Sequence, residues 1–136
     1  MPSAEHTSRD KPTLLEVVLQ VQGDFRSRLA SIGATPLQAG VLLYLQRHAE
    51  PRLIEVAAAV GVQPPTVTRV IHNLVRKRWV TNRHSIEDLR VVCLRLTRQG
   101  QVIARRIKDH VHRCEREMGK GNVLRMGQRL VKETRH

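Results

Sequence analysis

Two arginines, a histidine and an asparagine stand close together in the middle of the chain, at Arg69, His72, Asn73 and Arg76. On an α-helix these intervals of three, one and three residues place all four side chains on one side. Guanidinium and amide groups can hydrogen-bond to guanine and adenine edges, and cations pair with phosphates. The pattern predicts that this face of the helix contacts DNA, although an ordinary solvated helix can have the same composition.

The rest of this helix side offers further hydroxyl, amide and basic groups and no carboxylate. We expect Arg69 and Asn73, together with two threonines, to contact bases. We expect Arg76 and Lys77 to hold phosphates. The predicted DNA contacts of this segment are Gln63, Pro65, Thr66, Thr68, Arg69, His72, Asn73, Arg76 and Lys77.

Two helices around a tight turn are predicted to position this side. Apolar residues recur at helical intervals over 53–60, stop at Gly61, and resume with a new phase. Gly61 can adopt the positive φ that the turn needs. The two prolines that follow are tolerated only in the first turn of a helix, so the second helix is expected to begin at Gln63 or Pro64. Such pairs also occur in packed helical cores, and the pattern alone leaves that alternative open.

A two-stranded hairpin is predicted after the second helix, because apolar and polar residues begin to alternate there. Its loop, 84–90, is too long for a tight turn. A hairpin in this place is a wing, and Arg83, His84 and Arg90 are candidates for the phosphate backbone or the minor groove. Asp88 is expected to orient a neighbouring arginine through a charge-assisted hydrogen bond; a purely solvated loop is the alternative.

Further helices are predicted on both sides of this region. A long amphipathic helix runs from Leu14 to near Gly33. The next helix has a well-defined start, with Thr35 as N-cap and Gln38 as the partner that closes a capping box. Thr97 is expected to cap a second long helix.

A last helix is predicted over 122–133, beyond glycines at positions 119 and 121. The apolar stripes of the terminal helices exceed what a compact winged helix needs, so we expect them to bury one another across a two-fold axis. Packing within one chain is the alternative. The predicted dimer contacts are Leu14, Val18, Val21, Ile107, Val111, Cys114, Met118, Val123, Leu124 and Leu130.

Charge supports a polyanionic partner. The 136 residues contain 24 Lys and Arg against 12 Asp and Glu, a net charge of +12. Residues 1–62 hold six of each sign, whereas residues 63–136 hold the other 18 basic and six acidic groups. This field attracts nucleic acid, although RNA or a membrane surface would also respond to it. Only three aromatic side chains are present, which argues against a base-stacking platform for single strands or RNA.

No catalytic constellation or phosphate-cradling glycine loop is found in the sequence. Potential metal ligands occur at His110, His112 and Cys114, but only His110 and Cys114 lie on the same face of the predicted helix. Cys114 also falls in an apolar stripe, so a packed cysteine is favoured and no metal site is predicted. With Cys93 as the second cysteine, there are too few for a disulfide scaffold, which favours a reducing compartment.

These elements predict one integrated domain, mainly α with a small β-hairpin wing: a winged helix-turn-helix with dimerisation helices at both ends. The expected parts are a disordered tail over 1–12, a helical dimerisation region over 13–34 and 97–136, and a DNA-binding region over 35–96. No apolar run reaches the roughly 20 residues that a membrane span requires. We therefore expect a cytoplasmic protein with no membrane partner.

Four short strings in this order resemble the MarR family of winged-helix regulators. They are T-P-L-Q at 35–38, V-T-R at 67–69, D-L-R at 88–90 and L-T-R-Q-G at 96–100, and the resemblance extends over about 14–133. It implies a homodimer held by its terminal helices, recognition helices in successive major grooves of a pseudo-palindromic site, and wings over the flanking minor grooves. Many members of the family are repressors released by small phenolic ligands or by oxidation.

The sequence departs from the family pattern at several positions. Arg78 stands where the family usually has glycine, Leu89 where the wing usually has arginine, and Asn82 where an arginine is expected after the first wing strand. Arg90 is therefore the safer wing contact, and the minor-groove contact of the middle wing residue is in doubt. The first helix lacks the cysteine of redox-sensing members, so peroxide sensing through it is not expected.

Together these observations predict a sequence-specific regulator, most simply a repressor, that binds double-stranded DNA as a homodimer and is not an enzyme. The alternative is a basic architectural protein that binds DNA or RNA without choosing sequence. No cofactor is predicted. A small-molecule effector, if one exists, is expected between the first, second and long fifth helices, and the sequence does not identify it.

Overall fold

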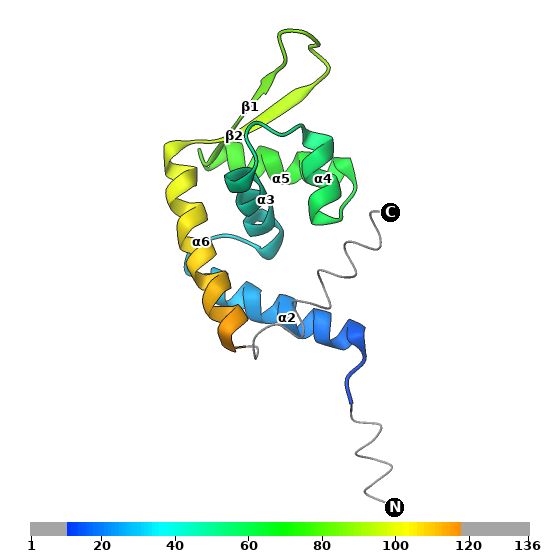
Figure 1. Ribbon diagram of the computed structural model, residues 1–136, viewed down its shortest axis with the longest axis vertical. Coiled ribbons are helices and arrows are strands. Elements are labelled where there is room, and N and C mark those ends of the chain that lie inside the picture. The colour runs from blue at the N-terminus through cyan, green and yellow to red at the C-terminus, as the bar shows by residue number, and fades with distance from the viewer. Residues whose placement is uncertain (1–10, 118–136) are drawn as a thin grey trace, which may run out of the picture.

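The computed structural model describes residues 11–117, which form five helices and one β-hairpin (Figure 1). A core of three helices carries the hairpin at one end, while two longer helices meet at the opposite end. The elements are α2 (Leu14–Leu29), α3 (Pro36–Arg47), α4 (Leu53–Val60), α5 (Pro64–Arg76), β1 (Val80–His84), β2 (Val92–Leu96) and α6 (Arg98–Glu117).

The helix-turn-helix pair forms as the sequence predicts. Gly61 ends α4 with a φ of 73°, and α5 begins at Pro64 with Gln63 as its N-cap. Ala57 is buried beside the turn, and its carbonyl accepts a hydrogen bond from the Val62 amide at 3.1 Å. A small side chain and a left-handed glycine thus let the two helices cross closely.

The predicted capping box at the start of α3 is also confirmed. The Gln38 amide donates to Thr35 Oγ1 at 3.1 Å, and the Thr35 amide donates to Gln38 Oε1 at 3.1 Å. One side of α3 then packs into the core through Val41, Leu42 and Leu45, all buried as expected. This fixed helix is the support on which α4, α5 and α6 are arranged.

The wing consists of β1, β2 and the loop 85–91 between them. The strands are antiparallel, with Val80 opposite Leu96 and His84 opposite Val92. The predicted hairpin is therefore confirmed, but its loop begins one residue later than expected. His84, the first residue of the predicted loop, is instead the last residue of β1, because the strand pairing continues to the His84–Val92 pair.

Helix α6 starts where the sequence predicts, and its first turn packs against the residues that follow α5. Thr97 Oγ1 accepts from the Gly100 amide at 2.9 Å and donates to the Arg78 carbonyl at 2.7 Å. A Cβ on Gly100 would lie 1.9 Å from the carbonyl oxygen of Trp79, so only glycine allows this approach. The cap explains Thr97, and the close packing of backbone on backbone explains Gly100.

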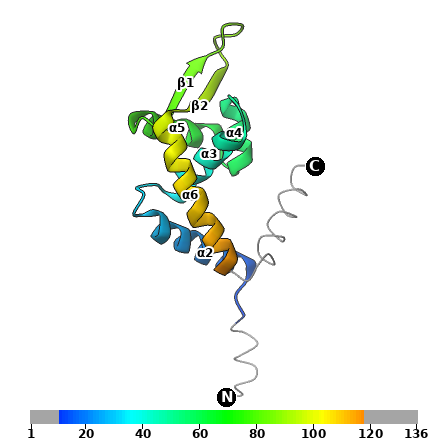
Figure 2. The same ribbon diagram turned by 60° about the vertical axis from the view of Figure 1, so that its left-hand side comes forward.

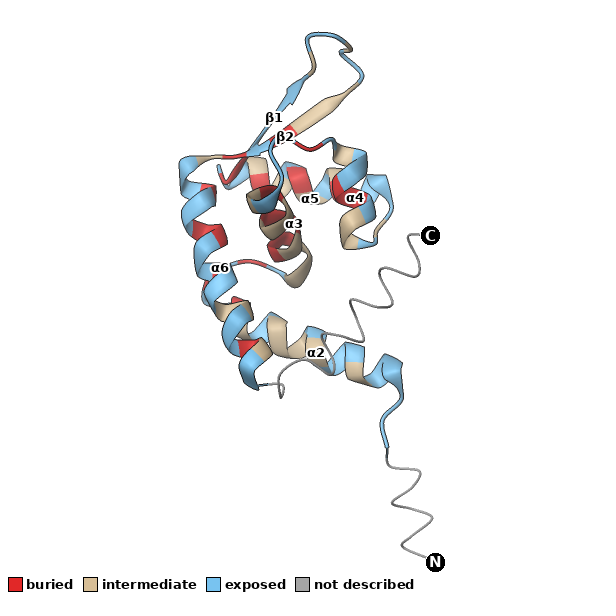
Figure 3. Ribbon diagram, in the orientation of Figure 1, coloured by how far each residue is buried: buried red, intermediate tan, exposed pale blue. Residues whose placement is uncertain are grey.

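Helix α2 crosses the far end of α6, as both views of the ribbon show (Figures 1 and 2). Burial is concentrated in α3 to α6, whereas the first half of α2 is largely exposed (Figure 3). Leu14 and Val18 are each 50% exposed, in keeping with a predicted interface, and Val21 is half-buried.

The predicted dimer contacts on α6 need correction. Ile107 and Cys114 are fully buried within the single chain, and Val111 is half-buried against the same core. The stripe on α6 is covered because α3 and α2 of the same chain pack on it. Intramolecular packing, the alternative considered above, therefore accounts for this stripe. The predicted contacts Met118, Val123, Leu124 and Leu130, the helix over 122–133 and most of the tail over 1–12 lie outside the described residues.

Candidate nucleic-acid interface

Helix α5 presents the predicted polar side to the outside. Val67, Ile71 and Leu74 are buried on its inner side, which holds the helix against the core. On the outer side Arg69, His72 and Arg76 are exposed, as are Gln63, Pro65 and Thr66, while Asn73 and Thr68 are half-buried. None of the salt bridges among residues 11–117 involves the two outer arginines. Their guanidinium groups therefore keep their donors available for a partner.

A groove of about 470 Å³ separates α5 from the wing. Its walls bring together Thr68 and His72 from the helix and His84 and Arg90 from the wing. Arg52, at the start of α4, also lines it, a residue that the sequence reasoning did not select. These groups are separated in the sequence, and only the fold gathers them around one groove, whose walls also include apolar side chains such as Leu53, Ile71 and Val92.

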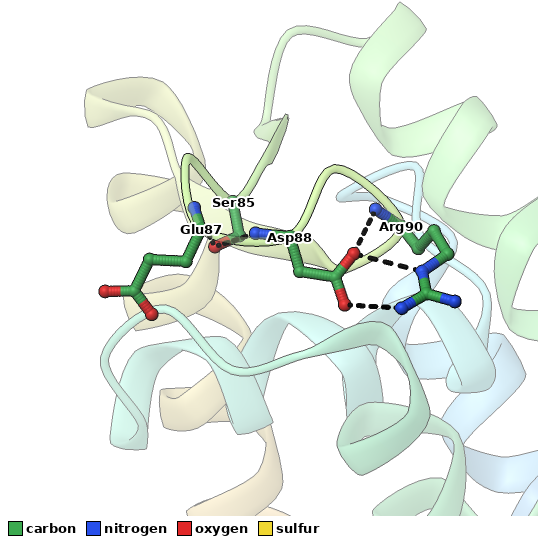
Figure 4. A network of polar contacts seen from close by, with 4 residues as sticks. All are labelled: Ser85, Glu87, Asp88 and Arg90. Carbon is green, nitrogen blue, oxygen red and sulfur yellow. Dashed lines mark hydrogen bonds and ion pairs between the residues drawn. The ribbon is translucent and has the colours of Figure 1, made fainter.

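The wing loop holds Arg90 through a carboxylate, as predicted (Figure 4). Arg90 Nε donates to Asp88 Oδ1 at 3.1 Å and Nη2 donates to Oδ2 at 3.4 Å, while the Arg90 amide donates to Oδ1 at 3.0 Å. These bonds lower the pKa of the Asp88 carboxyl, with the side-chain bond to Arg90 as the largest cause. Ser85 Oγ accepts from the amides of Glu87 and Asp88 and shapes the turn before them.

The wing also holds features that the sequence reasoning missed. Arg83 Nη2 donates to Glu50 Oε1 at 3.1 Å, which ties the end of β1 to the segment after α3. The 33-residue separation of this pair gave no local signal. At the loop itself, Ile86 is 98% exposed and Leu89 is 72% exposed. The loop therefore presents apolar side chains beside a neutralised arginine.

Lys77 has partners within the chain for its ammonium group, which the sequence reasoning did not predict. Nζ donates to the Gly33 carbonyl and, at 3.4 Å, to Gln38 Oε1. It also lies 4.6 Å from the centroid of the Trp79 ring. The ammonium thus has partners within the chain while the residue stays exposed, and its phosphate contact remains a prediction.

Arg78 adopts a φ of 65° directly after the recognition helix. This conformation is costly for a side chain with a Cβ and explains why glycine is common at such a position. The following backbone is nevertheless fixed, since the Trp79 amide donates to the Leu74 carbonyl at 3.0 Å. Arg78 therefore replaces the usual glycine without changing the backbone turn after α5.

Cys114 is buried in the apolar side of α6, as favoured above. Its thiol donates to Asp24 Oδ2 at 3.4 Å, and burial is the main cause that raises its pKa. Asp24 in turn pairs with Arg28, which also pairs with Glu117. This arrangement links α2 to α6. No group of three or more His, Cys, Asp or Glu side chains within residues 11–117 is placed to hold a metal ion.

Comparison with known proteins agrees with this geometry. The model of the MarR family matches residues 32–90. The chain is also 30% identical over 103 residues to the HTH-type transcriptional repressor MdtR of Bacillus subtilis (strain 168), an alignment that covers 75% of this chain and 66% of MdtR. The chain belongs to the MarR family.

Two solved structures have the same fold as this MarR-family protein. The transcriptional repressor CouR, bound to a 23-mer DNA duplex, superposes with a TM-score of 0.76 at 25% identity over 89% of each chain. A mutant of MarR from E. coli, complexed with operator DNA, superposes with a TM-score of 0.71 at 22% identity over 87% of each chain. The winged helix fold of this MarR-family protein is thereby confirmed.

The family is one of transcriptional regulators and is not a class of enzymes. Among the described residues of this MarR-family protein, none of the helices is both long and apolar enough to cross a membrane.

Proposed function

We propose that this MarR-family protein is a transcriptional repressor that binds a dyad-symmetric sequence of double-stranded DNA. The observation that carries the proposal is the exposed outer side of α5, where two arginines that form no salt bridge within residues 11–117 lie beside Asn73 and Thr66. In the major groove Arg69 can donate two hydrogen bonds to guanine, and Asn73 can make a bidentate contact with adenine. Arg76 lies toward the end of the helix, where a phosphate contact fixes its orientation.

The names of similar proteins support this assignment. MdtR is named as a transcriptional repressor, and the CouR structure holds a DNA duplex. The match covers 66% of MdtR, less than its whole length. The proposal for this chain therefore rests first on the chemistry of α5.

A dyad-symmetric site calls for two copies of α5, which a homodimer would supply. Leu14, Leu15, Val18 and Leu19 are each at least half exposed along the first half of α2. Apolar surface of this kind is stabilised when a second copy covers it. A two-fold dimer would place two copies of α5 about 34 Å apart, in successive major grooves.

We propose that the DNA backbone passes along the groove between α5 and the wing. With α5 in the major groove, the wing reaches the neighbouring minor groove and the intervening strand passes between them. His72, His84 and Arg90 would then face phosphates from both walls.

We further propose that binding requires no cofactor and no catalytic step, since the side chains of α5 supply the donors and acceptors themselves. A repressor acts where the DNA is, and we therefore place the protein in the cytoplasm. EDTA-treated protein should bind DNA with unchanged affinity and leave the duplex intact.

Selection from a random pool of DNA duplexes, followed by footprinting, tests the proposed function. We expect one enriched dyad-symmetric sequence, a single protected site and the mass of a dimer by light scattering. Arg106→Ala, on the exposed side of α6, is the control and should retain the same site. Even coating of all duplexes would instead favour an architectural protein, and preferential binding of RNA would also contradict the repressor.

A further inference from the structure

Lys77 stands at the end of the recognition helix but is attached to another part of the molecule. It is the C-cap of α5, and its amide still donates to the Asn73 carbonyl at 3.0 Å. Its ammonium reaches 44 positions back along the chain to the Gly33 carbonyl. A second, longer hydrogen bond reaches Gln38 Oε1. The contact therefore joins the end of α5 to a segment that is distant in the sequence.

One acceptor, Gly33, lies in the segment that connects α2 to α3, and the other, Gln38, lies in the first turn of α3. Gly33 has a φ of 85°, and its amide donates to the Leu29 carbonyl at the end of α2 at 3.2 Å. Gln38 is 8% exposed, and the same Oε1 also accepts from the Thr35 amide. The ammonium is thus bound to a segment that is itself fixed by the end of one helix and the start of the next.

The third partner of the ammonium is the ring of Trp79. This side chain is buried, and its backbone carbonyl accepts from the Thr97 amide at 3.0 Å. Gly100 packs directly on that carbonyl. A cation over the ring is attracted by its π electrons. Lys77 consequently lies where the end of α5, the α2–α3 connection and the start of α6 meet.

We propose that Lys77 is a positioning residue, which fixes the direction of α5 relative to α2 rather than binding DNA. The inference rests on the proposed function, in which α2 contributes to the dimer and α5 enters the major groove. Because the contact is at one end of α5, a small rotation moves the other end most. For a helix of 13 residues, or about 20 Å, a rotation of about 5° displaces the far end by about 1.7 Å. That displacement exceeds the tolerance of hydrogen bonds to base edges.

Lys77→Met tests this role, because methionine keeps much of the apolar stem and removes the ammonium. Arg76→Met is the matched control, since Arg76 is the adjacent exposed cation of α5. Binding is measured by fluorescence anisotropy over a range of salt concentrations. The duplexes are the selected operator, the same half-sites moved apart by one base pair, and a random sequence.

For Lys77→Met we expect operator affinity to fall by about tenfold. The salt slope and the affinity for random DNA should not change, because no phosphate contact is lost. The loss should be larger on the optimal spacing than on the shifted one, whereas general destabilisation would weaken both alike. Lys77→Arg should restore the spacing preference, as a guanidinium can make the same contacts. Arg76→Met should weaken binding to operator and random DNA and lower the slope by about 1.8 for a dimer.

A lower salt slope and weaker random binding for Lys77→Met would overturn the inference and restore Lys77 as a phosphate contact. Unchanged operator affinity and spacing preference would also overturn it. If Lys77→Met does not fold by circular dichroism, Lys77→Gln is used in the same comparison. Failure of the proposed function is distinguishable, because the wild-type protein would then show no preferred duplex at all.

Discussion

Helix α5 and the wing use their arginines in opposite ways. The outer arginines of α5, Arg69 and Arg76, enter none of the salt bridges among residues 11–117. In the wing, Arg83 and Arg90 are each paired with a carboxylate. The loop 85–91 contains two carboxylates and one arginine, so it carries no excess of positive charge.

The difference separates two tasks of an interface. An unpaired guanidinium retains all its donors and attracts DNA at a distance. A paired guanidinium is oriented in advance, but its partner cancels much of its field. We infer that α5 provides sequence reading and electrostatic attraction, whereas the wing provides a shaped contact with an apolar tip at Ile86 and Leu89.

The largest expected effect follows from Arg69→Ala. Loss of a bidentate base contact should weaken operator binding by about 1 to 3 kcal/mol and leave random DNA unaffected. Anisotropy titrations with both duplexes measure it, and Arg76→Ala is the control that should weaken both similarly. Equal losses on both duplexes for Arg69→Ala would show that α5 supplies only positive charge. The difference between α5 and the wing would then be only that the wing arginines are paired with carboxylates.

A smaller effect of opposite sign is expected for Asp88→Asn. The change removes a negative charge and releases the Arg90 guanidinium, so affinity for random DNA should rise by about twofold at low salt. Discrimination between operator and random DNA should fall, because the arginine is no longer oriented.

Glu50→Gln is the matched comparison for that variant, since it releases Arg83 at the base of the wing. We expect it to raise affinity for random DNA less than Asp88→Asn does, and both are measured by the same titrations. Weaker binding of Asp88→Asn to random DNA would show that the pair itself makes the phosphate contact.

The smallest effect is the pH response of the wing pair. The pKa of Asp88 lies below its ordinary value of 3.8, so the pair stabilises the folded wing above that value and is lost as the pH falls through the lowered pKa. Between pH 8 and pH 5 the pair should therefore remain intact. An NMR titration of the Asp88 carboxyl carbon measures this, with Arg90→Gln expected to move the midpoint upward. A midpoint at or above 3.8 in the wild-type protein would contradict the pairing.

Local features were predictable to the extent that neighbouring residues decide them. The turn at Gly61 and the caps at Thr35 and Thr97 depend on backbone conformation and hydrogen bonds over three or four positions. The Asp88–Arg90 pair spans only two positions and was predicted for the same reason. The MarR-type order of elements follows from these signals together.

The errors concern contacts between distant segments. The sequence placed Ile107 in the dimer, because an apolar stripe is compatible with packing in one chain or between two, and it gave no sign that the chain itself engages the Lys77 ammonium. The folded chain covers Ile107 and engages Lys77 through Gly33.

The amino-acid sequence by itself determined the helices, the turn, the wing and the polar outer side of α5, since periodicity, caps and glycine conformation act over a few residues. Only the tertiary structure decided which cations remain available to DNA. A charged side chain is free or engaged according to what lies within a few ångströms of it, and for Lys77 and Arg83 those partners come from parts of the chain 44 and 33 positions away.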